Sequence, residues 1–489
     1  MSSILNFIVG ICVCYVTALL LRFYIWVESE LYYSSYFGRV FFFTLLGGME
    51  MKEAIVAKFG GSSLADSKQF EKVKDIIGLN NKRRYIIPSA PGKRHSQDHK
   101  ITDLLYMCYQ LASHGLNFDE VYSIVEKRYE DICVDLSLEI NIKEILMEIK
   151  DKIRNGASRD YAASRGEYLN GIILSNYIGF EFIDAAELII FNNKGQFDAE
   201  ATERKVVSRL AQTFNAVIPG FYGAKSNGDI ITFSRGGSDI TGSIIANGIK
   251  AQLYENWTDV SGFLMADPRI VKDPKPIETI TYKELRELSY MGAPVLHEEA
   301  IFPVKRLGIP INIKNTNSPE DKGTMIVDDS SPISLVDTIT GIAGKKDFTV
   351  VSVEKTLMTL EKGFFRKLIS VFETNDISIE HMPSSIDSIS VIISNSELNS
   401  KLEKVLEEIR IYCKPDNIIC YPNMALIAVV GRGMIKAKGI SAKVFTSLAN
   451  NGVNIRMITQ GSSELNIIVG VENSDFENAI ASIYDAFKN

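Results

Sequence analysis

Two stretches in the first part of the chain have the same order of apolar, glycine and helix-like positions. The apolar run Ala54–Phe59 is followed by two glycines, and then by a charge-rich stretch with helical spacing from Asp66 to Ile77. The apolar run Ile230–Phe233 is followed by another glycine pair and by the helical stretch Ile240–Ile249. Each pattern predicts a strand, a glycine turn and a helix.

The last third of the chain matches itself at a spacing of 76 residues without a gap. Lys362-Gly363 falls on Lys438-Gly439, and Val391-Ile392-Ile393 falls on Ile467-Ile468-Val469. In each copy, apolar positions at i, i+4, i+5 and i+8 form one helix face between apolar or alternating strands. Two copies suit a paired module, since a solenoid needs more repeats.

Each copy therefore predicts a strand, a glycine turn, a helix, two strands and a final amphipathic helix. A strand after each final helix completes a βαββαβ unit. We place the first copy at 338–413 and the second at 418–489. We also expect one of the two sheets to use a strand from Thr338–Ala343, so the boundary between the copies is not sharp.

The first fifty residues differ from the rest. Ile4–Leu21 is an apolar run that just reaches the length of a membrane helix. The alternative, which we favour, is that residues 1–50 are an apolar leader from a mis-assigned start. The codons of Gly47-Gly48 can spell a ribosome-binding sequence, and a predicted strand begins directly after Met51. We expect translation to begin at Met51 or Met49.

Composition removes several classes of protein. The 489 residues carry 53 Lys and Arg against 60 Asp and Glu, a net charge of −7, which argues against general nucleic-acid binding. Six scattered cysteines do not form a disulfide scaffold, and we expect reduced thiols and a cytoplasmic protein. None of the five histidines lies in a GxSxG or HExxH pattern.

Three short constellations carry candidate chemistry. Lys58 precedes Gly60-Gly61-Ser62-Ser63, a turn whose backbone N–H groups could approach a phosphate, although a solvated lysine at a glycine turn is the plainer interpretation. Arg235 and Asp239 flank Gly236-Gly237, which suits a bidentate carboxylate ligand or an ordinary surface pair. Thr258-Asp259, followed by a loop with Arg269, suits a nucleotide at the carboxyl edge of a sheet.

These constellations belong to a longer set of motifs that resembles the aspartate kinases. The motifs follow the family order over 52–330 and are KFGGSS at 58–63, SAPG at 89–92, ITDLL at 101–105, SRGE at 164–167, PGFYG at 219–223, SRGGSD at 234–239, WTDVSG at 257–262, ADPR at 266–269 and GAPVLH at 292–297. The resemblance implies the amino-acid-kinase fold, an αβα sandwich around a mostly parallel sheet, over 51–335. It also implies transfer of the ATP γ-phosphate to the side-chain carboxylate of L-aspartate, the first step towards lysine, threonine and methionine.

The same resemblance assigns roles to individual residues. The catalytic residues are Lys58 and Asp239. The ATP site consists of Lys58, Gly60, Gly61, Ser62, Thr258, Asp259, Leu264 and Arg269, and Leu264 stands where many members have a tyrosine. The aspartate site consists of Thr102, Glu167, Arg235 and Ser238, with Arg235 on the α-carboxylate and Glu167 on the ammonium. The acceptor carboxylate is already ionised at pH 7, so the chemistry needs positive charge from Lys58, Arg235 and Mg²⁺ rather than a general base.

The repeated copies resemble ACT domains, which are ferredoxin-like sensors of small molecules that usually pair into homo-oligomers. Copy one has Glu380 and Asp387 where copy two has Arg456 and Ser463. Because two carboxylates can bind an ammonium, we predict that both lie on one pocket rim in copy one, with lysine as the favoured effector and threonine as another possibility. The predicted effector residues are Met358, Gly363, Phe364, Phe365, Ser378, Ile379, Glu380 and Asp387.

Two other functions stay open at this point. One is a kinase of the same fold that acts on another acidic substrate, such as glutamate or acetylglutamate. The other is a non-catalytic amino-acid sensor with a decayed kinase domain. Intact Lys58, Glu167, Arg235 and Asp239 favour the active enzyme over the sensor.

Overall fold

The computed structural model describes residues 53–234, 236–293, 300–331 and 338–488. The predicted leader, the start at Met49 or Met51, Arg235 and most of the GAPVLH motif lie outside the described residues. Within the described ranges, no helix combines the length and the apolar character needed to cross a membrane.

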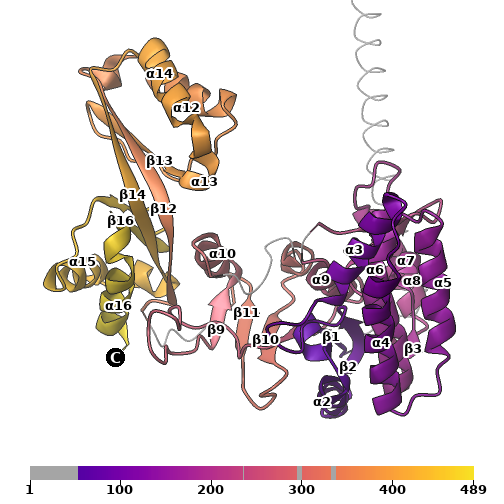
Figure 1. Ribbon diagram of the computed structural model, residues 1–489. Coiled ribbons are helices and arrows are strands. Elements are labelled where there is room, and N and C mark those ends of the chain that lie inside the picture. The colour runs from indigo at the N-terminus through magenta and orange to yellow at the C-terminus, as the bar shows by residue number, and fades with distance from the viewer. Residues whose placement is uncertain (1–52, 235, 294–299, 332–337, 489) are drawn as a thin grey trace, which may run out of the picture. The chain divides into compact units, whose positions relative to one another are not determined.

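The larger sheet has eight strands in the order β3-β5-β2-β1-β8-β10-β11-β9 (Figure 1). Neighbouring strands run parallel, except that β10 and β11 are antiparallel. The strands are β1 (Ile55–Phe59), β2 (Arg83–Pro88), β3 (Glu181–Phe182), β5 (Ala216–Val217), β8 (Leu253–Thr258), β9 (Thr279–Thr281), β10 (Ile311–Asn315) and β11 (Thr324–Val327). A sheet of this kind is stable only when both faces are covered.

Helices cover both faces, as the alternation of side chains along β1 demonstrates. Val56 packs into one core with residues of α8 and α9, whereas Ala57 and Phe59 pack into a second core with residues of α2 to α6. The helices are α2 (Ser67–Gly78), α3 (Ile101–Ser113), α4 (Asp119–Asp135), α5 (Ile142–Arg154), α6 (Arg159–Ile178), α7 (Ala185–Leu188), α8 (Ala199–Leu210), α9 (Gly237–Gly248), α10 (Tyr282–Tyr290) and α11 (Phe302–Lys305). The predicted αβα sandwich is confirmed. A small sheet of β4 (Ile190–Phe191), β6 (Tyr222–Lys225) and β7 (Ile230–Thr232) accompanies it.

The C-terminal part forms one antiparallel sheet in the order β13-β12-β14-β16-β15. Its strands are β12 (Gly341–Glu354), β13 (Ser388–Ser394), β14 (Asn417–Val430), β15 (Met457–Thr459) and β16 (Asn466–Glu472). Its helices are α12 (Phe364–Thr374), α13 (Asn395–Leu398), α14 (Leu402–Cys413), α15 (Ile440–Asn450) and α16 (Phe476–Phe487). The long strands β12 and β14 run through both copies (Figure 1).

The repeat is confirmed at the level of single backbone angles. Helices α12 and α15 begin and end 76 residues apart, and each follows a glycine in the left-handed region, Gly363 at φ 84° and Gly439 at φ 85°. Residues of β12 from 341 to 345 pair with β14 residues 430 to 426, in the sheet of copy two. The expected borrowed strand is therefore present. The border of copy one at residue 338 is too early, because this strand belongs to copy two.

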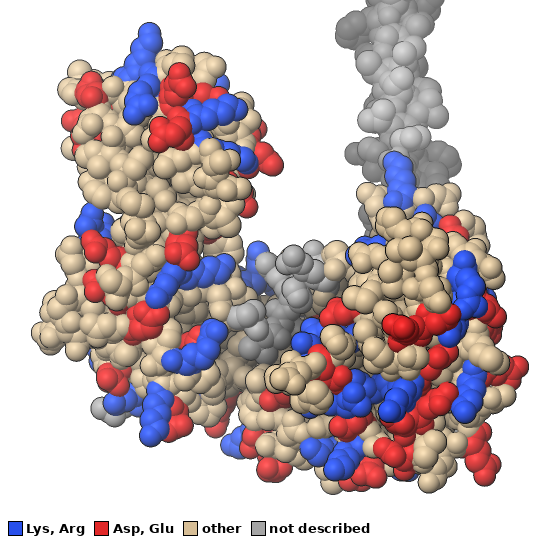
Figure 2. Space-filling model, in the orientation of Figure 1, with Lys and Arg blue, Asp and Glu red and all other residues tan. Residues whose placement is uncertain are grey.

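Two further features of the described residues are the distribution of surface charge and the state of the cysteines. On the face drawn in Figure 2, Lys and Arg are interspersed with Asp and Glu over the described residues. Cys108, Cys133, Cys413 and Cys420 are free, as predicted, and burial raises the pKa of the Cys133 thiol to about 11.

Candidate functional site

The candidate site lies at the carboxyl edge of the central parallel strands. β1, β2, β8 and β10 run in the same direction and end at Phe59, Pro88, Thr258 and Asn315. Ligands of open α/β sheets bind at this edge. Directly after β1, the Gly60 N–H donates to the Trp257 carbonyl oxygen over 2.9 Å, and the chain turns into a 3₁₀ helix, η1 (Gly61–Leu64).

Lys58, Asp239 and Asn256 form a closed triangle at this edge. Lys58 Nζ lies 2.6 Å from Asp239 Oδ1 and donates to Asn256 Oδ1 over 3.4 Å. Asn256 Nδ2 donates to the same Asp239 Oδ1 over 3.0 Å. The Lys58 and Asp239 side chains are 10% and 15% exposed, so this pair is sheltered from solvent but remains reachable.

The predicted phosphate turn lies close to the SAPG segment. The Gly92 N–H donates to the Gly61 carbonyl oxygen over 2.8 Å, and a Cβ on either glycine would come within 2.8 Å of the opposite backbone. Buried Arg128 holds both segments, because its guanidinium donates to the Gly92 carbonyl at 3.1 Å and to the Ala65 carbonyl at 3.2 Å, and pairs with Asp98. The glycines are needed for this close approach.

Glu167 is a buried carboxyl with unused hydrogen-bonding capacity. It is 5% exposed, and among the described residues its Oε2 has no hydrogen-bond partner. Burial raises the pKa of Glu167 to about 8, against the lowering effects of a hydrogen bond from the Ala90 backbone and of the charges on Arg165 and Lys58. A buried polar atom without a partner suits a ligand that brings a donor, such as an ammonium.

The other predicted substrate residues lie around the same edge. Thr102 is half-buried in the first turn of α3, and Ser238 is buried in the first turn of α9, one residue before Asp239. Arg235, which the sequence assigns to the α-carboxylate of the substrate, lies outside the described residues.

Two of the predicted nucleotide residues, Leu264 and Arg269, are more exposed than Lys58 and Asp239. Thr258 Oγ1 donates to Asp259 Oδ1 over 3.1 Å, and Leu264 is 38% exposed. The Arg269 side chain is 86% exposed and pairs with Asp267 at 2.6 Å, within its own loop. Among the described residues no hydrogen bond or ion pair joins Arg269 to the Lys58 triangle.

Several residues at this edge were missed by the sequence analysis. Asn256 and Arg128 make the contacts given above. Ser63 Oγ and Thr316 Oγ1 lie 2.7 Å apart and connect η1 with the segment after β10. Half-buried Lys314 lies 5.1 Å from the centroid of the Trp257 ring, and burial lowers the pKa of its ammonium. A strand asparagine and a helix arginine carry no distinctive sequence signal, whereas the motif KNT at 314–316 lies at the end of a strand and could have been noticed.

The two acidic residues of the predicted effector site in copy one lie at different places along a hairpin. The Glu380 N–H pairs with the Ile392 carbonyl, whereas Asp387 lies in the turn before β13. The backbone positions of Glu380 and Asp387 are therefore about five strand residues apart along the hairpin, roughly 16 Å. Glu380 accepts a hydrogen bond from Tyr290 of α10, and Asp387 accepts the Leu357 N–H over 2.8 Å.

The other residues of that predicted site differ in their burial. Met358 and Phe364 are each 1% exposed and belong to the core beneath α12. Phe365 is 39% exposed, Ser378 is exposed and Ile379 is half-buried. Gly363 serves as the left-handed N-cap of α12.

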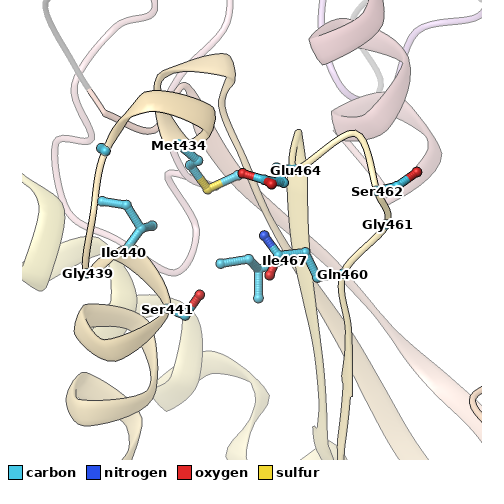
Figure 3. A pocket seen from close by; sticks show the side chains of 10 residues that line it. Met434, Gly439, Ile440, Ser441, Gln460, Gly461, Ser462, Glu464 and Ile467 are labelled. Carbon is cyan, nitrogen blue, oxygen red and sulfur yellow. The ribbon is translucent and has the colours of Figure 1, made fainter.

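Copy two contains a cavity at the position equivalent to the predicted site. Its volume is about 460 Å³, and it is lined by Met434, Ala437, Gly439, Ile440, Ser441, Gln460, Gly461, Ser462, Glu464 and Ile467. Figure 3 shows Ser441 at the start of α15, Gln460 directly after β15 and Ile467 of β16 pointing toward one another, with Met434 near Glu464 and Ser462 turned away. A second cavity of about 390 Å³ is lined from both copies and includes Ser384, Ser390 and Arg456.

Comparisons with known proteins agree with this architecture. Residues 53–315 match the model of the amino acid kinase family, and residues 427–487 match an ACT domain model. Aspartokinase 3 of Bacillus subtilis is 36% identical over 447 residues, which cover 88% of this chain and 98% of that protein. The chain belongs to the aspartokinases.

Solved structures extend the comparison to the whole aspartokinase fold. Aspartate kinase of Clostridium acetobutylicum is 58% identical with a TM-score of 0.83, covering 89% of this chain and 100% of that chain. Aspartokinase III of Escherichia coli, solved with aspartate and ADP and also with lysine and aspartate, is 24% identical with a TM-score of 0.68. These two structures each cover 89% of this chain and 100% of theirs, and they support the fold alone.

Proposed function

We propose that this aspartokinase transfers the γ-phosphate of ATP to the side-chain carboxylate of L-aspartate at the carboxyl edge of the eight-stranded sheet, as the first step towards lysine, threonine and methionine. The observation that carries the proposal is the contact of Lys58 with Asp239 beside the glycine turn, together with the partnerless Oε2 atom of Glu167, whose carboxyl lies close enough to Lys58 to be influenced by its charge. The names of its aspartokinase relatives agree with aspartate as the acceptor.

We divide the roles as the sequence motifs suggest. Lys58 meets the transferred phosphoryl group, and the backbone at Gly60, Gly61 and Ser62 supports the phosphates. Thr258, Asp259, Leu264 and Arg269 hold the nucleoside end. Thr102, Glu167, Arg235 and Ser238 hold aspartate, with Glu167 on its ammonium. The ADP in the Escherichia coli relative is consistent with ATP as the donor.

Catalysis at this site would depend on how the reacting groups are positioned and on the positive charge placed between them. The nucleophilic carboxylate and the phosphates are both anionic, so an ammonium between them lowers the cost of bringing them together. Among the described residues no group of three His, Cys, Asp or Glu side chains could hold a metal ion. One carboxylate is enough for Mg²⁺ that arrives with ATP, and Asp239 could supply it. Mg²⁺ bound in this way would neutralise charge on the phosphates.

The primary test is turnover of ATP with L-aspartate, with glutamate and acetylglutamate as competing acceptors. Lys58→Met should lower kcat by a hundred-fold or more, because one charge on the transferred group contributes several kcal/mol in the transition state. Thermal unfolding of the variant should stay cooperative. Lys322→Met, at a lysine whose side chain is 86% exposed, is the control. Retention of a tenth of wild-type turnover by Lys58→Met would contradict the assignment.

The raised pKa of Glu167 predicts a pH dependence of aspartate binding. Without ligand, Glu167 keeps its proton up to about pH 8 in the folded protein, whereas the unfolded chain loses it near the ordinary value of 4.5. The unfolded state therefore binds fewer protons in this window, and the contribution of Glu167 to stability falls as pH rises. Binding the substrate ammonium requires the ionised form, so KM for aspartate should fall as pH rises from 6.5 to 8.5. Glu167→Gln should raise KM and flatten this profile, and an unchanged profile would refute the role.

We further propose feedback regulation by an amino acid bound to an ACT copy, with lysine tested first and threonine second. The lysine complex of the Escherichia coli relative supports lysine. In copy two, Glu464 can accept an ammonium, and the N–H groups at the start of α15 can receive a carboxylate. A cytoplasmic location and a homo-oligomer paired through ACT sheets complete the proposal. Titration of both amino acids, separately and together, into the turnover assay tests the regulation.

A further inference from the structure

Strand β8 presents two residues that hold Asp239 from one side. Tyr254 and Asn256 are two positions apart, so their side chains lie on the same face of the strand. Tyr254 Oη donates to the Asp239 backbone carbonyl over 3.1 Å, and Asn256 Nδ2 donates to Asp239 Oδ1 over 3.0 Å. Tyr254 is fully buried and Asn256 is 3% exposed. Both ends of the Asp239 residue are thereby fixed to the sheet.

Asn256 is chemically suited to the space between a carboxylate and an ammonium. Its amide nitrogen donates to Asp239 while its amide oxygen accepts from Lys58. An aspartate here would only accept hydrogen bonds, and an alanine would do neither. The register of the sheet creates this arrangement, because Lys58 of β1 pairs directly with Asn256 of β8.

We propose that Asn256 is a positioning residue for phosphoryl transfer, which keeps Asp239 and the Lys58 ammonium in a fixed relation while Lys58 engages the phosphates. The inference rests on the proposed function. In the ligand-free protein Lys58 is bound to Asp239, and an arriving phosphate competes for that ammonium. The amide of Asn256 holds the Asp239 carboxylate during this exchange and gives Lys58 a second, neutral partner.

This role predicts that kcat changes far more than KM. The proposed nucleotide and aspartate contacts do not include Asn256, so ground-state binding should persist when its amide is removed. The position of Lys58 against the transferred group matters most in the transition state. Asn256→Ala should therefore lower kcat ten- to hundred-fold, while KM for ATP and for aspartate stays within three-fold.

The experiment compares four variants of the full chain by steady-state kinetics, ADP binding by calorimetry and thermal unfolding. Asn256→Asp should lose more kcat than Asn256→Ala, because a second carboxylate competes with Asp239 for Lys58. Tyr254→Phe, which removes only the hydroxyl, should lose about three-fold in kcat. Asn193→Asp makes the same amide-to-acid change at an exposed turn, where the side-chain oxygen still accepts from Ser226, and should behave as wild type.

Two outcomes would overturn the inference. One is a kcat within three-fold of wild type in Asn256→Ala, accompanied only by a lower melting temperature, which means a structural role. The other is a rise in KM or a loss of ADP binding that accounts for the whole effect, which makes Asn256 a binding residue. Failure of the proposed function is distinguishable, because the wild type would then show no aspartate-dependent turnover.

Discussion

The two ACT copies have the same backbone but use it differently. At the start of the helix, copy one carries Phe364-Phe365 where copy two carries Ile440-Ser441. The two rings of copy one lie 6.5 Å apart and Phe364 is fully buried, whereas Ser441 lines the cavity of copy two. The position of the acidic residue also differs, because copy two has Glu464 where copy one has Ser388. The volume and charge of a few side chains thus distinguish the two copies of a repeated fold, and one of these side chains lines the cavity of copy two.

The copies also differ in their hydrogen bonds to the kinase domain. Copy two contacts the segment that carries the predicted nucleotide residues, because the Ile342 N–H donates to the Met265 carbonyl over 2.7 Å and Tyr484 Oη accepts the Lys275 N–H over 3.0 Å. Copy one meets helix α10 through Glu380, which accepts from Tyr290. A ligand that shifts copy two is therefore better placed to change nucleotide affinity, and each prediction below tests this contrast.

The largest effect is expected from Glu284, which ties α10 to copy two. This carboxylate is 1% exposed, and it accepts hydrogen bonds from Thr340 Oγ1 at 2.6 Å, from the Arg432 N–H at 3.0 Å and from Thr281. Glu284→Ala leaves the buried donors of Thr281 and the part-buried donors of Thr340 and Arg432 without this acceptor, and should lower the free energy of unfolding by about 3 kcal/mol. Urea denaturation measures the loss. Glu278→Ala, at a largely exposed glutamate, is the control, and equal losses in the two variants would remove the special role of Glu284.

The next effect concerns the volume of the cavity. Ser441→Phe gives copy two the side chain of copy one, and should raise the effector concentration for half-inhibition by thirty-fold or more, about 2 kcal/mol, because the ring fills the cavity. Inhibition of turnover by lysine and by threonine is the measurement. The reciprocal change, Phe365→Ser, should have a small effect on inhibition. The reverse order of effects would move the sensor to copy one.

A smaller effect is expected from the charge of the cavity. Glu464→Gln removes the carboxylate proposed for the effector ammonium and should raise the half-inhibitory concentration about ten-fold, or 1.4 kcal/mol. Ser388→Ala changes the equivalent position of copy one and serves as its match. Glu380→Ala tests the original sequence-based choice of copy one. A greater shift from Glu380→Ala than from Glu464→Gln would restore that choice.

The smallest effect is expected at the contact of copy one with α10. Tyr290 is 52% exposed, and partial burial together with the neighbouring Glu380 raises the pKa of its phenol. Tyr290→Phe removes one hydrogen bond near solvent and should lower the free energy of unfolding by less than about 1 kcal/mol. Urea denaturation beside Glu284→Ala tests the ranking. A loss as large as that of Glu284→Ala would mean that both copies are held to the kinase domain equally.

Local sequence determined much of this protein. The strand, glycine and helix pattern places Lys58 at a strand end and Asp239 in the first turn of a helix, and the repeat of 76 residues predicts two copies with the same helix bounds. These features depend on apolar periodicity and on backbone conformations that favour glycine. Both are properties of neighbouring residues, so they are readable along the chain.

Only the tertiary structure decides which side chains contact one another at these sites. Asn256 meets Lys58 across 198 positions because β1 and β8 are neighbours in one sheet, and Arg128 reaches the loop residue Gly92 from helix α4. Glu380 and Asp387 are close in sequence, yet an extended hairpin separates them and other groups occupy both carboxylates. The cavity of copy two depends on the volumes of side chains that meet only after packing. Periodicity specifies which face of an element is buried, whereas the register between strands and the space left between side chains specify what each residue touches.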